Sequence, residues 1–91
     1  MNLGETIRML RKERKIKLKE LASLAGISNN ALVAIEKDRS MPTKATFQKI
    51  CEGLGVSVAY VLASTITEED LPPQKREVFR LLMPLFKEQV K

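Results

Sequence analysis

Residues 16–42 read IKLKELASLAGISNNALVAIEKDRSMP, and they contain two short helical patterns separated by a glycine. The spacing of the apolar residues predicts one helix at about residues 18–24 and a second at residues 29–37. Gly26 lies where the first helix must stop in a left-handed conformation, and Ser28 offers a side-chain oxygen that can cap the second helix. Two helices joined by so tight a turn are expected to cross steeply, which leaves the outer face of the second helix protruding. The apolar inner faces consist of Leu21, Ala22 and Ala25 in the first helix, and of Leu32 and Ile35 in the second.

This helix-turn-helix geometry suits a second helix that enters the major groove of DNA. The residues that carry a family pattern, in order along the chain, are Ile7, Arg11, Glu20, Leu21, Ala22, Ala25, Gly26, Ile27, Ser28, Leu32, Ile35, Glu36, Pro42, Thr43, Leu54, Gly55, Val56 and Ser57. On these residues, segment 3–63 resembles the phage-repressor helix-turn-helix family, also called Cro-like or XRE-type. The resemblance covers most of the chain and implies a DNA-binding domain of five helices.

The remaining sequence predicts an all-α architecture. We expect a five-helix, repressor-like helix-turn-helix domain over residues 1–63, a polar linker over residues 64–73, and an appended amphipathic helix over residues 74–91. Pro84 lies inside the apolar pattern of that last helix and should kink or split it, because proline lacks the backbone donor that a helix interior needs.

Three further helix starts carry capping signals. Asn2, with Glu5 three residues later, fits a capping box for the first helix. Thr43 can cap a fourth helix over residues 44–53, and Ser57 can cap a short fifth one.

Composition and charge limit the classes of function. The 91 residues carry a net charge of +5 and include one cysteine and no histidine. A single Cys51 excludes an intramolecular disulfide and a cysteine-based zinc site, and the missing histidine excludes His-dependent catalysis. We therefore expect no metal, no cofactor and no enzymatic activity. With no apolar run long enough to span a membrane and no signal-peptide core, we expect a cytoplasmic protein without membrane contact.

The positive charge is uneven along the chain. Residues 1–63 contain eleven Lys and Arg against six Asp and Glu, whereas residues 64–91 contain five of each. A basic helical domain beside a neutral tail suggests that a polyanion such as double-stranded DNA meets the helical domain.

The family resemblance implies an ion pair between Arg11 in the first helix and Glu36 in the third. Such a pair would hold the recognition helix at its docking angle, and losing one partner would cost about 3 kcal/mol if the pair is buried. The alternative is an exposed pair that contributes less than about 1 kcal/mol.

The resemblance also places base-reading side chains on the outer face of the third helix, at Asn29, Asn30 and Ala34, with Val33 nearby. Asparagine can form two hydrogen bonds with adenine, and Val33 and Ala34 can contact thymine methyl groups. This combination predicts a site rich in A·T pairs. The alternative is that the two asparagines merely favour the first turn of a helix.

Four cations around the third helix are candidate phosphate contacts: Lys17, Lys37, Arg39 and Lys44. Each of them alone could equally be a solvated surface charge. Three residues depart from the family pattern. Lys17 replaces a small polar residue that ordinarily caps the second helix. Leu18 replaces a glutamine that ordinarily contacts phosphate, and Asp38 replaces a common glycine. Asp38 can adopt a left-handed conformation, but its charge would be unfavourable close to a DNA backbone.

The last helix has an apolar face with two possible partners. Its members recur at three- and four-residue intervals and are Val78, Leu81, Leu82, Leu85 and Phe86. They could pack back on the five-helix body, or they could form a two-fold interface with a second copy. We favour the dimer, because one such domain rarely makes enough contacts for specific binding.

The function expected from these observations is that of a sequence-specific DNA-binding transcriptional regulator, a repressor that binds a short palindromic operator as a homodimer. The alternative is a protein-interaction module or antitoxin that keeps the fold, binds a protein partner, and binds DNA weakly or not at all.

Overall fold

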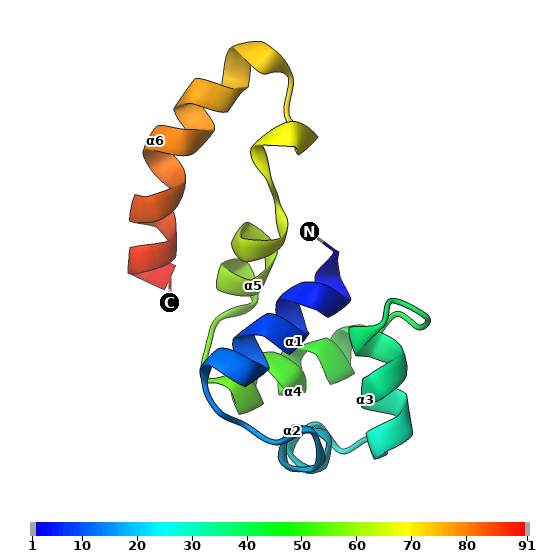
Figure 1. Ribbon diagram of the computed structural model, residues 1–91. Coiled ribbons are helices and arrows are strands. Elements are labelled where there is room, and N and C mark those ends of the chain that lie inside the picture. Colours follow the sequence, from blue (N-terminus) through cyan, green and yellow to red (C-terminus); the bar gives the residue numbers. More distant parts are fainter. Residues whose placement is uncertain (1, 91) are drawn as a thin grey trace.

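The computed structural model describes the backbone of residues 2–90 and the side chains of residues 2–85. Over these residues the chain is helical, which confirms the predicted all-α, repressor-like fold with an appended helix (Figure 1). The elements are α1 (Leu3–Glu13), α2 (Leu18–Ala25), α3 (Asn29–Glu36), α4 (Lys44–Leu54), α5 (Val58–Thr65), the short 3-10 helix η1 (Glu68–Asp70) and α6 (Pro73–Val90). None of the described helices is both long enough and apolar enough to cross a membrane.

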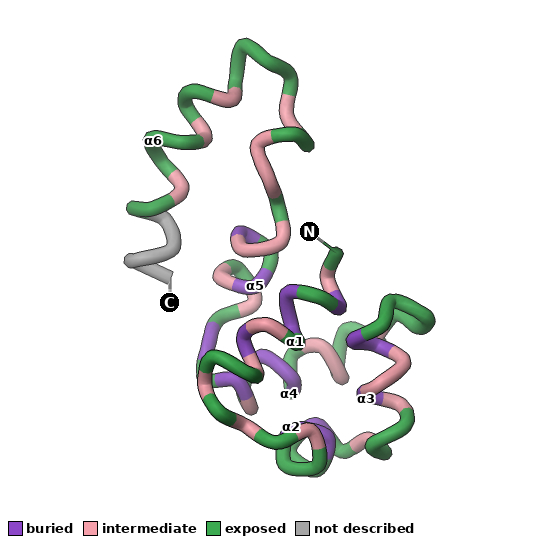
Figure 2. Tube along the Cα trace, in the orientation of Figure 1, coloured by how far each residue is buried: buried purple, intermediate pink, exposed green. Residues whose placement is uncertain are grey.

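The hydrophobic core lies among helices α1 to α5 (Figure 2). Helix α2 packs against α3 and α4, while α1 packs against α3 and α5. The fully buried aliphatic side chains at the centre come from all five helices and include Ile7, Leu21, Leu32, Ile50 and Val61. Burial of these side chains removes the apolar inner faces of the helices from water. The outer faces remain in contact with water, where polar and charged residues are favourable.

The predicted turn and cap residues behave as their chemistry requires. Gly26 and Gly55 end α2 and α4 with φ values of 71° and 73°, in the left-handed region that glycine adopts without steric cost. The hydroxyl groups of Ser28, Thr43 and Ser57 accept backbone N–H groups in the first turns of α3, α4 and α5. These contacts confirm the starts of three helices.

The capping box predicted for α1 is wrong. The Asn2 side chain accepts no backbone N–H group; instead its amide nitrogen donates to a Glu5 carboxylate oxygen at 3.3 Å. The acceptor for a first-turn amide comes from far along the chain, because the backbone N–H of Gly4 donates to Asp38 Oδ1 at 3.0 Å. The carboxylate therefore caps α1 from the loop that follows α3.

The C-terminal part differs from expectation in two details. The connection expected over residues 64–73 is partly helical, because α5 continues to Thr65 and η1 follows it. Of the two outcomes expected at Pro84, a kink or a split, the split is wrong, since α6 continues as one element to Val90. Proline removes only one backbone donor, and the flanking helical bonds keep the element continuous.

The segment after α5 leads away from the body, and α6 runs back toward α5 on the side of the molecule opposite α3 (Figure 1). Helix α6 packs against α5 and η1. An ion pair between Glu68 and Arg80, with a Nε–Oε2 distance of 2.6 Å, links η1 to α6. Most of the described part of α6 is exposed (Figure 2).

Candidate nucleic-acid interface

The α2–α3 unit has the backbone geometry of a helix-turn-helix. Helix α2 ends in a Schellman motif, in which the Gly26 amide donates to the Ser23 carbonyl at 3.1 Å and the Ile27 amide donates to the Ala22 carbonyl at 3.0 Å. Ser28 then caps α3 through the Ala31 amide at 3.0 Å. This compact turn joins the two helices through three residues, 26–28, and leaves one face of α3 outside the core.

That outer face contains the four side chains predicted to read bases. Asn29 and Asn30 are exposed in the first turn of α3, whereas Val33 and Ala34 are half-buried. Helix α6 packs on α5 and η1, so the tail leaves this face open (Figure 1). The structure thus makes Asn29 and Asn30 available to a large partner, and their contact with bases stays a prediction.

The four predicted phosphate contacts are all exposed cations. Lys17 is the N-cap residue of α2, Lys37 is the C-cap residue of α3, and Lys44 is the first residue of α4. Arg39 lies in the loop between α3 and α4. Of the four, Lys37 lines the groove beside α3, whereas Lys17 lines a different groove at the start of α2.

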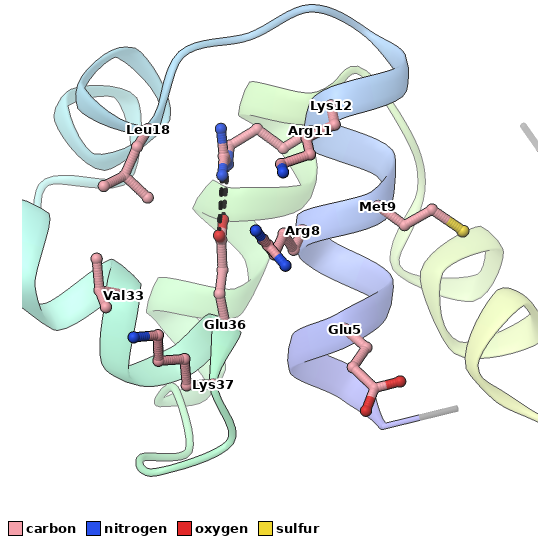
Figure 3. A pocket seen from close by; sticks show the side chains of 9 residues that line it. All are labelled: Glu5, Arg8, Met9, Arg11, Lys12, Leu18, Val33, Glu36 and Lys37. Carbon is pink, nitrogen blue, oxygen red and sulfur yellow. Dashed lines mark hydrogen bonds and ion pairs between the residues drawn. The ribbon is translucent and has the colours of Figure 1, made fainter.

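Arg11 and Glu36 form a bidentate ion pair between α1 and α3 (Figure 3). The Nε–Oε2 and Nη2–Oε1 distances are 2.7 and 3.0 Å. The third nitrogen, Nη1, donates to the Ile16 carbonyl at 3.1 Å, so one guanidinium joins α1, α3 and the loop before α2. The side chains are only 11% and 5% exposed, and the alternative of an exposed pair therefore does not describe this site.

A groove of about 480 Å³ opens beside this ion pair, between α1 and α3 (Figure 3). Its lining combines cationic side chains with apolar ones and consists of Glu5, Arg8, Met9, Arg11, Lys12, Leu18, Val33, Glu36 and Lys37. Arg8 and Lys12 are exposed cations of α1 that the sequence interpretation did not assign to the site. Their spacing of four residues was the available signal, because it places both on one face of a helix.

Lys17 begins α2 without a side-chain cap, whereas the departures at Leu18 and Asp38 have a structural explanation. Leu18 is half-buried and packs against the core at the start of α2, where its side chain also lines the groove. Asp38 has a φ of 58°, as expected for a residue that replaces glycine in the left-handed region. Its carboxylate is directed to the Gly4 amide, so the charge is partly neutralised by the positive end of α1.

Comparison with known proteins identifies the same region. A family model described as helix-turn-helix matches residues 7–61. The immunity repressor protein of Bacillus phage phi105 is 34% identical over 71 residues, which cover 77% of this chain and 49% of that protein. The Escherichia coli (strain K12) HTH-type transcriptional regulator SutR is 43% identical over 54 residues, covering 59% of this chain and 30% of the regulator.

The Bacillus subtilis (strain 168) HTH-type transcriptional repressor RghR is 38% identical over 56 residues, covering 60% of this chain and 42% of the repressor. The aligned part of this chain thus spans less than half the length of each of these relatives. The family match covers α2, the turn and α3 together with most of the core around them. The chain therefore belongs to the phage-repressor (Cro-like, XRE-type) helix-turn-helix family of DNA-binding transcriptional regulators.

Proposed function

We propose that this protein is a repressor that binds a short palindromic operator as a homodimer, with α3 in the major groove. The single observation that carries the proposal is the open outer face of α3, with Asn29 and Asn30 exposed on a capped helix. The Arg11–Glu36 ion pair holds this helix against α1. Two of the similar proteins are named as repressors, which supports the direction of regulation.

Asn30 is the principal base reader in this proposal. Its side-chain amide can donate to N7 of adenine and accept from the N6 amine, a bidentate pair worth about 1–3 kcal/mol of discrimination. Asn29 contributes a second polar contact from the same turn. Val33 and Ala34 contact thymine methyl groups, which favours A·T pairs over G·C pairs at the adjacent positions.

The phosphate backbone is bound by cations on both sides of α3. Lys17, Lys37, Arg39 and Lys44 form the set predicted from the sequence, and we add Arg8 and Lys12 because they are exposed in the groove between α1 and α3. The apolar side chains of the same groove suit the sugar carbons between two phosphates. If about half of these cations in the dimer each neutralise one phosphate, roughly six in all, log Kd should rise with log salt with a slope near 5.

The dimer is formed by the apolar surface of α5 and α6. The exposed fractions of Val78, Leu81, Leu82 and Leu85 are 53–67%, so packing within the chain leaves them uncovered. Leu62 of α5 and Ile66, the residue after it, are also exposed. A shallow apolar groove of about 310 Å³ between the two helices is lined by Ala59, Leu62, Ala63, Ile66 and Met83. A second copy would cover both helices. The Phe86 side chain, also assigned to the interface from the sequence, lies outside the described residues.

The neutral net charge of residues 64–91 favours a second copy of this chain as the partner of the apolar surface. Residues 64–91 carry five basic and five acidic groups, so two tails can approach each other without net repulsion, whereas two basic α3 faces cannot. Joining the chains at the end opposite α3 leaves both recognition helices free. A two-fold arrangement could then present them about 34 Å apart, at successive turns of the major groove.

A different protein as the partner of the same apolar surface is the second candidate function. In that case the chain would form a hetero-complex, and purified protein alone would stay monomeric. Exposed apolar surface supports this reading as well as the dimer, but the basic face around α3 supports only the DNA-binding one.

Selection of bound sequences from a random duplex pool tests the proposal. We expect two A·T-rich half-sites in inverted orientation, with centres about one helical turn apart. A single enriched half-site would contradict the dimer while supporting base reading by α3. No enrichment at low salt would contradict the repressor function itself.

A further inference from the structure

Helix α1 is attached to the C-terminal end of α3 at two points. At one point the Arg11 side chain holds the Glu36 carboxylate through two hydrogen bonds. At the other, the Gly4 amide donates to Asp38 Oδ1 at 3.0 Å. Gly4 and Arg11 are seven residues apart, which corresponds to about 10 Å along a helix. A single attachment would let α3 pivot against α1, whereas two separated attachments fix the angle between them.

The attachment at Gly4 is unusually close. Gly4 is buried, and a methyl group added to it would overlap the backbone carbonyl oxygens of Ile35 and Glu36. The missing side chain therefore lets the first turn of α1 lie directly against the last turn of α3. The partial positive charge of one helix end meets the partial negative charge of the other, which is a favourable arrangement of helix dipoles.

Asp38 completes this contact at a conformational cost. The Gly4 amide belongs to the first turn of α1 and has no acceptor within its own helix, and the Asn2 side chain is directed to Glu5 instead. The Asp38 carboxylate supplies the acceptor in a charge-assisted hydrogen bond. To do so, Asp38 holds a φ of 58°, a conformation that is unfavourable for a residue with a side chain. Glycine would adopt this backbone freely but could not supply the acceptor.

We propose that Asp38 is a positioning residue for DNA recognition: by capping α1 from the loop after α3, it fixes the angle at which α3 meets the major groove. This inference rests on the proposed function and deepens it. Asp38 does not contact DNA in this account, because its carboxylate is occupied by α1. Asp38 is an exposed residue, and its Oδ1 is directed to the first turn of α1 rather than outward from the loop.

Two substitutions separate the side-chain role from the backbone role. Asp38→Asn keeps an oxygen acceptor and a residue type that tolerates the left-handed region, while Asp38→Gly removes the acceptor and relieves the backbone. If the side chain positions α3, Asp38→Gly should be impaired and Asp38→Asn should resemble wild type. If only the backbone conformation is important, Asp38→Gly should equal or exceed wild type. The two accounts therefore predict effects of opposite sign.

Two measurements distinguish these variants. Hydrogen exchange at the Gly4 amide reports the cap without DNA, and we expect about tenfold faster exchange in Asp38→Gly and less than about twofold change in Asp38→Asn. The ratio of affinities for the selected duplex and for a duplex with one changed base pair reports the angle of α3. We expect this ratio to fall in Asp38→Gly only. A merely destabilised protein would instead lose affinity for both duplexes equally.

The outcomes are distinguishable from those of the proposed function. Unchanged Gly4 exchange or an unchanged affinity ratio in Asp38→Gly would overturn the positioning role while the wild-type protein still binds DNA. Failure of every protein to bind DNA, wild type included, would overturn the proposed function and with it the positioning role. Values close to wild type in Asp38→Asn, both for Gly4 exchange and for the affinity ratio, would support the positioning role.

Discussion

At the scale of single residues, Arg11 has the most consequential contacts. It is nearly buried, and it binds the Glu36 side chain and the Ile16 carbonyl together. We expect Arg11→Ala to lower the free energy of unfolding by about 3 kcal/mol, because it leaves the Glu36 charge buried without a partner. Urea denaturation measures this loss. Arg80→Ala is the matched control, since it removes an equally short but exposed ion pair and should leave the midpoint nearly unchanged. Equal midpoints for the two variants would contradict a stabilising role.

Cys51 provides a second test at this scale. Burial, followed by the negative charge of Glu52, raises the pKa of the Cys51 thiol to about 11. At pH 8 the thiol therefore stays protonated and shielded, and we expect negligible reaction with a thiol reagent in the folded protein. Labelling in urea, where the thiol is exposed, is the control. Rapid labelling of the native protein would show that α4 is packed more loosely than the structure indicates.

At the scale of the helical elements, the junction of η1 and α6 should respond to acid. A hydrogen bond from Arg80 lowers the pKa of Glu68 below its ordinary 4.5, and the Thr67 amide lowers the pKa of Asp70 below its ordinary 3.8. The folded state thus binds fewer protons than the unfolded state in this range. The stabilising contribution of the Glu68 and Asp70 carboxylates is present above their ordinary pKa values. It is lost as the pH falls through the lowered pKa values.

We therefore expect hydrogen exchange in the first half of α6 to accelerate below about pH 4 beyond its intrinsic pH dependence, while exchange in α4 does not. Glu68→Gln should show weakened protection of α6 already at neutral pH. Protection of α6 that stays constant in acid would mean that apolar contacts with α5 hold it without these carboxylates.

The elements also show how far sequence alone could predict this structure. Caps that depend on neighbours within three residues, such as Ser28 and Thr43, followed from local chemistry and are observed. The capping box predicted at Asn2 is wrong, because the Gly4 amide donates to Asp38, which is 34 residues away. That hydrogen bond forms only when α1 packs on α3. The cationic groove containing Arg8 and Lys12 was missed for the same reason, since it requires two helices to be placed side by side.

At the scale of the whole molecule, α3 and α6, which carries exposed apolar residues, lie at opposite ends (Figure 1). We expect the wild-type protein to form dimers in a concentration-dependent way, as measured by analytical ultracentrifugation. Because Leu81 is 67% exposed, Leu81→Lys should leave the folded monomer intact. The substitution should abolish the dimer, because it places a charge in the apolar interface. Gln74→Lys, the same change in charge at an exposed position outside the apolar set, should leave the dimer intact. A wild-type protein that stays monomeric would contradict the dimer and favour a different protein as the partner of the apolar surface.

We propose that α3 reads bases while exposed cations such as Lys44 bind phosphates. The most direct measurement compares Asn30→Ala and Lys44→Ala on the selected operator and on a panel of single-base-pair variants. We predict that Asn30→Ala removes about 1–3 kcal/mol of discrimination at one position of each half-site and leaves the preferences at other positions unchanged. Lys44→Ala should weaken binding to every duplex alike and reduce the salt slope by about 1 for each cation removed. Uniform weakening by Asn30→Ala, with discrimination unchanged at every position, would contradict base recognition by α3.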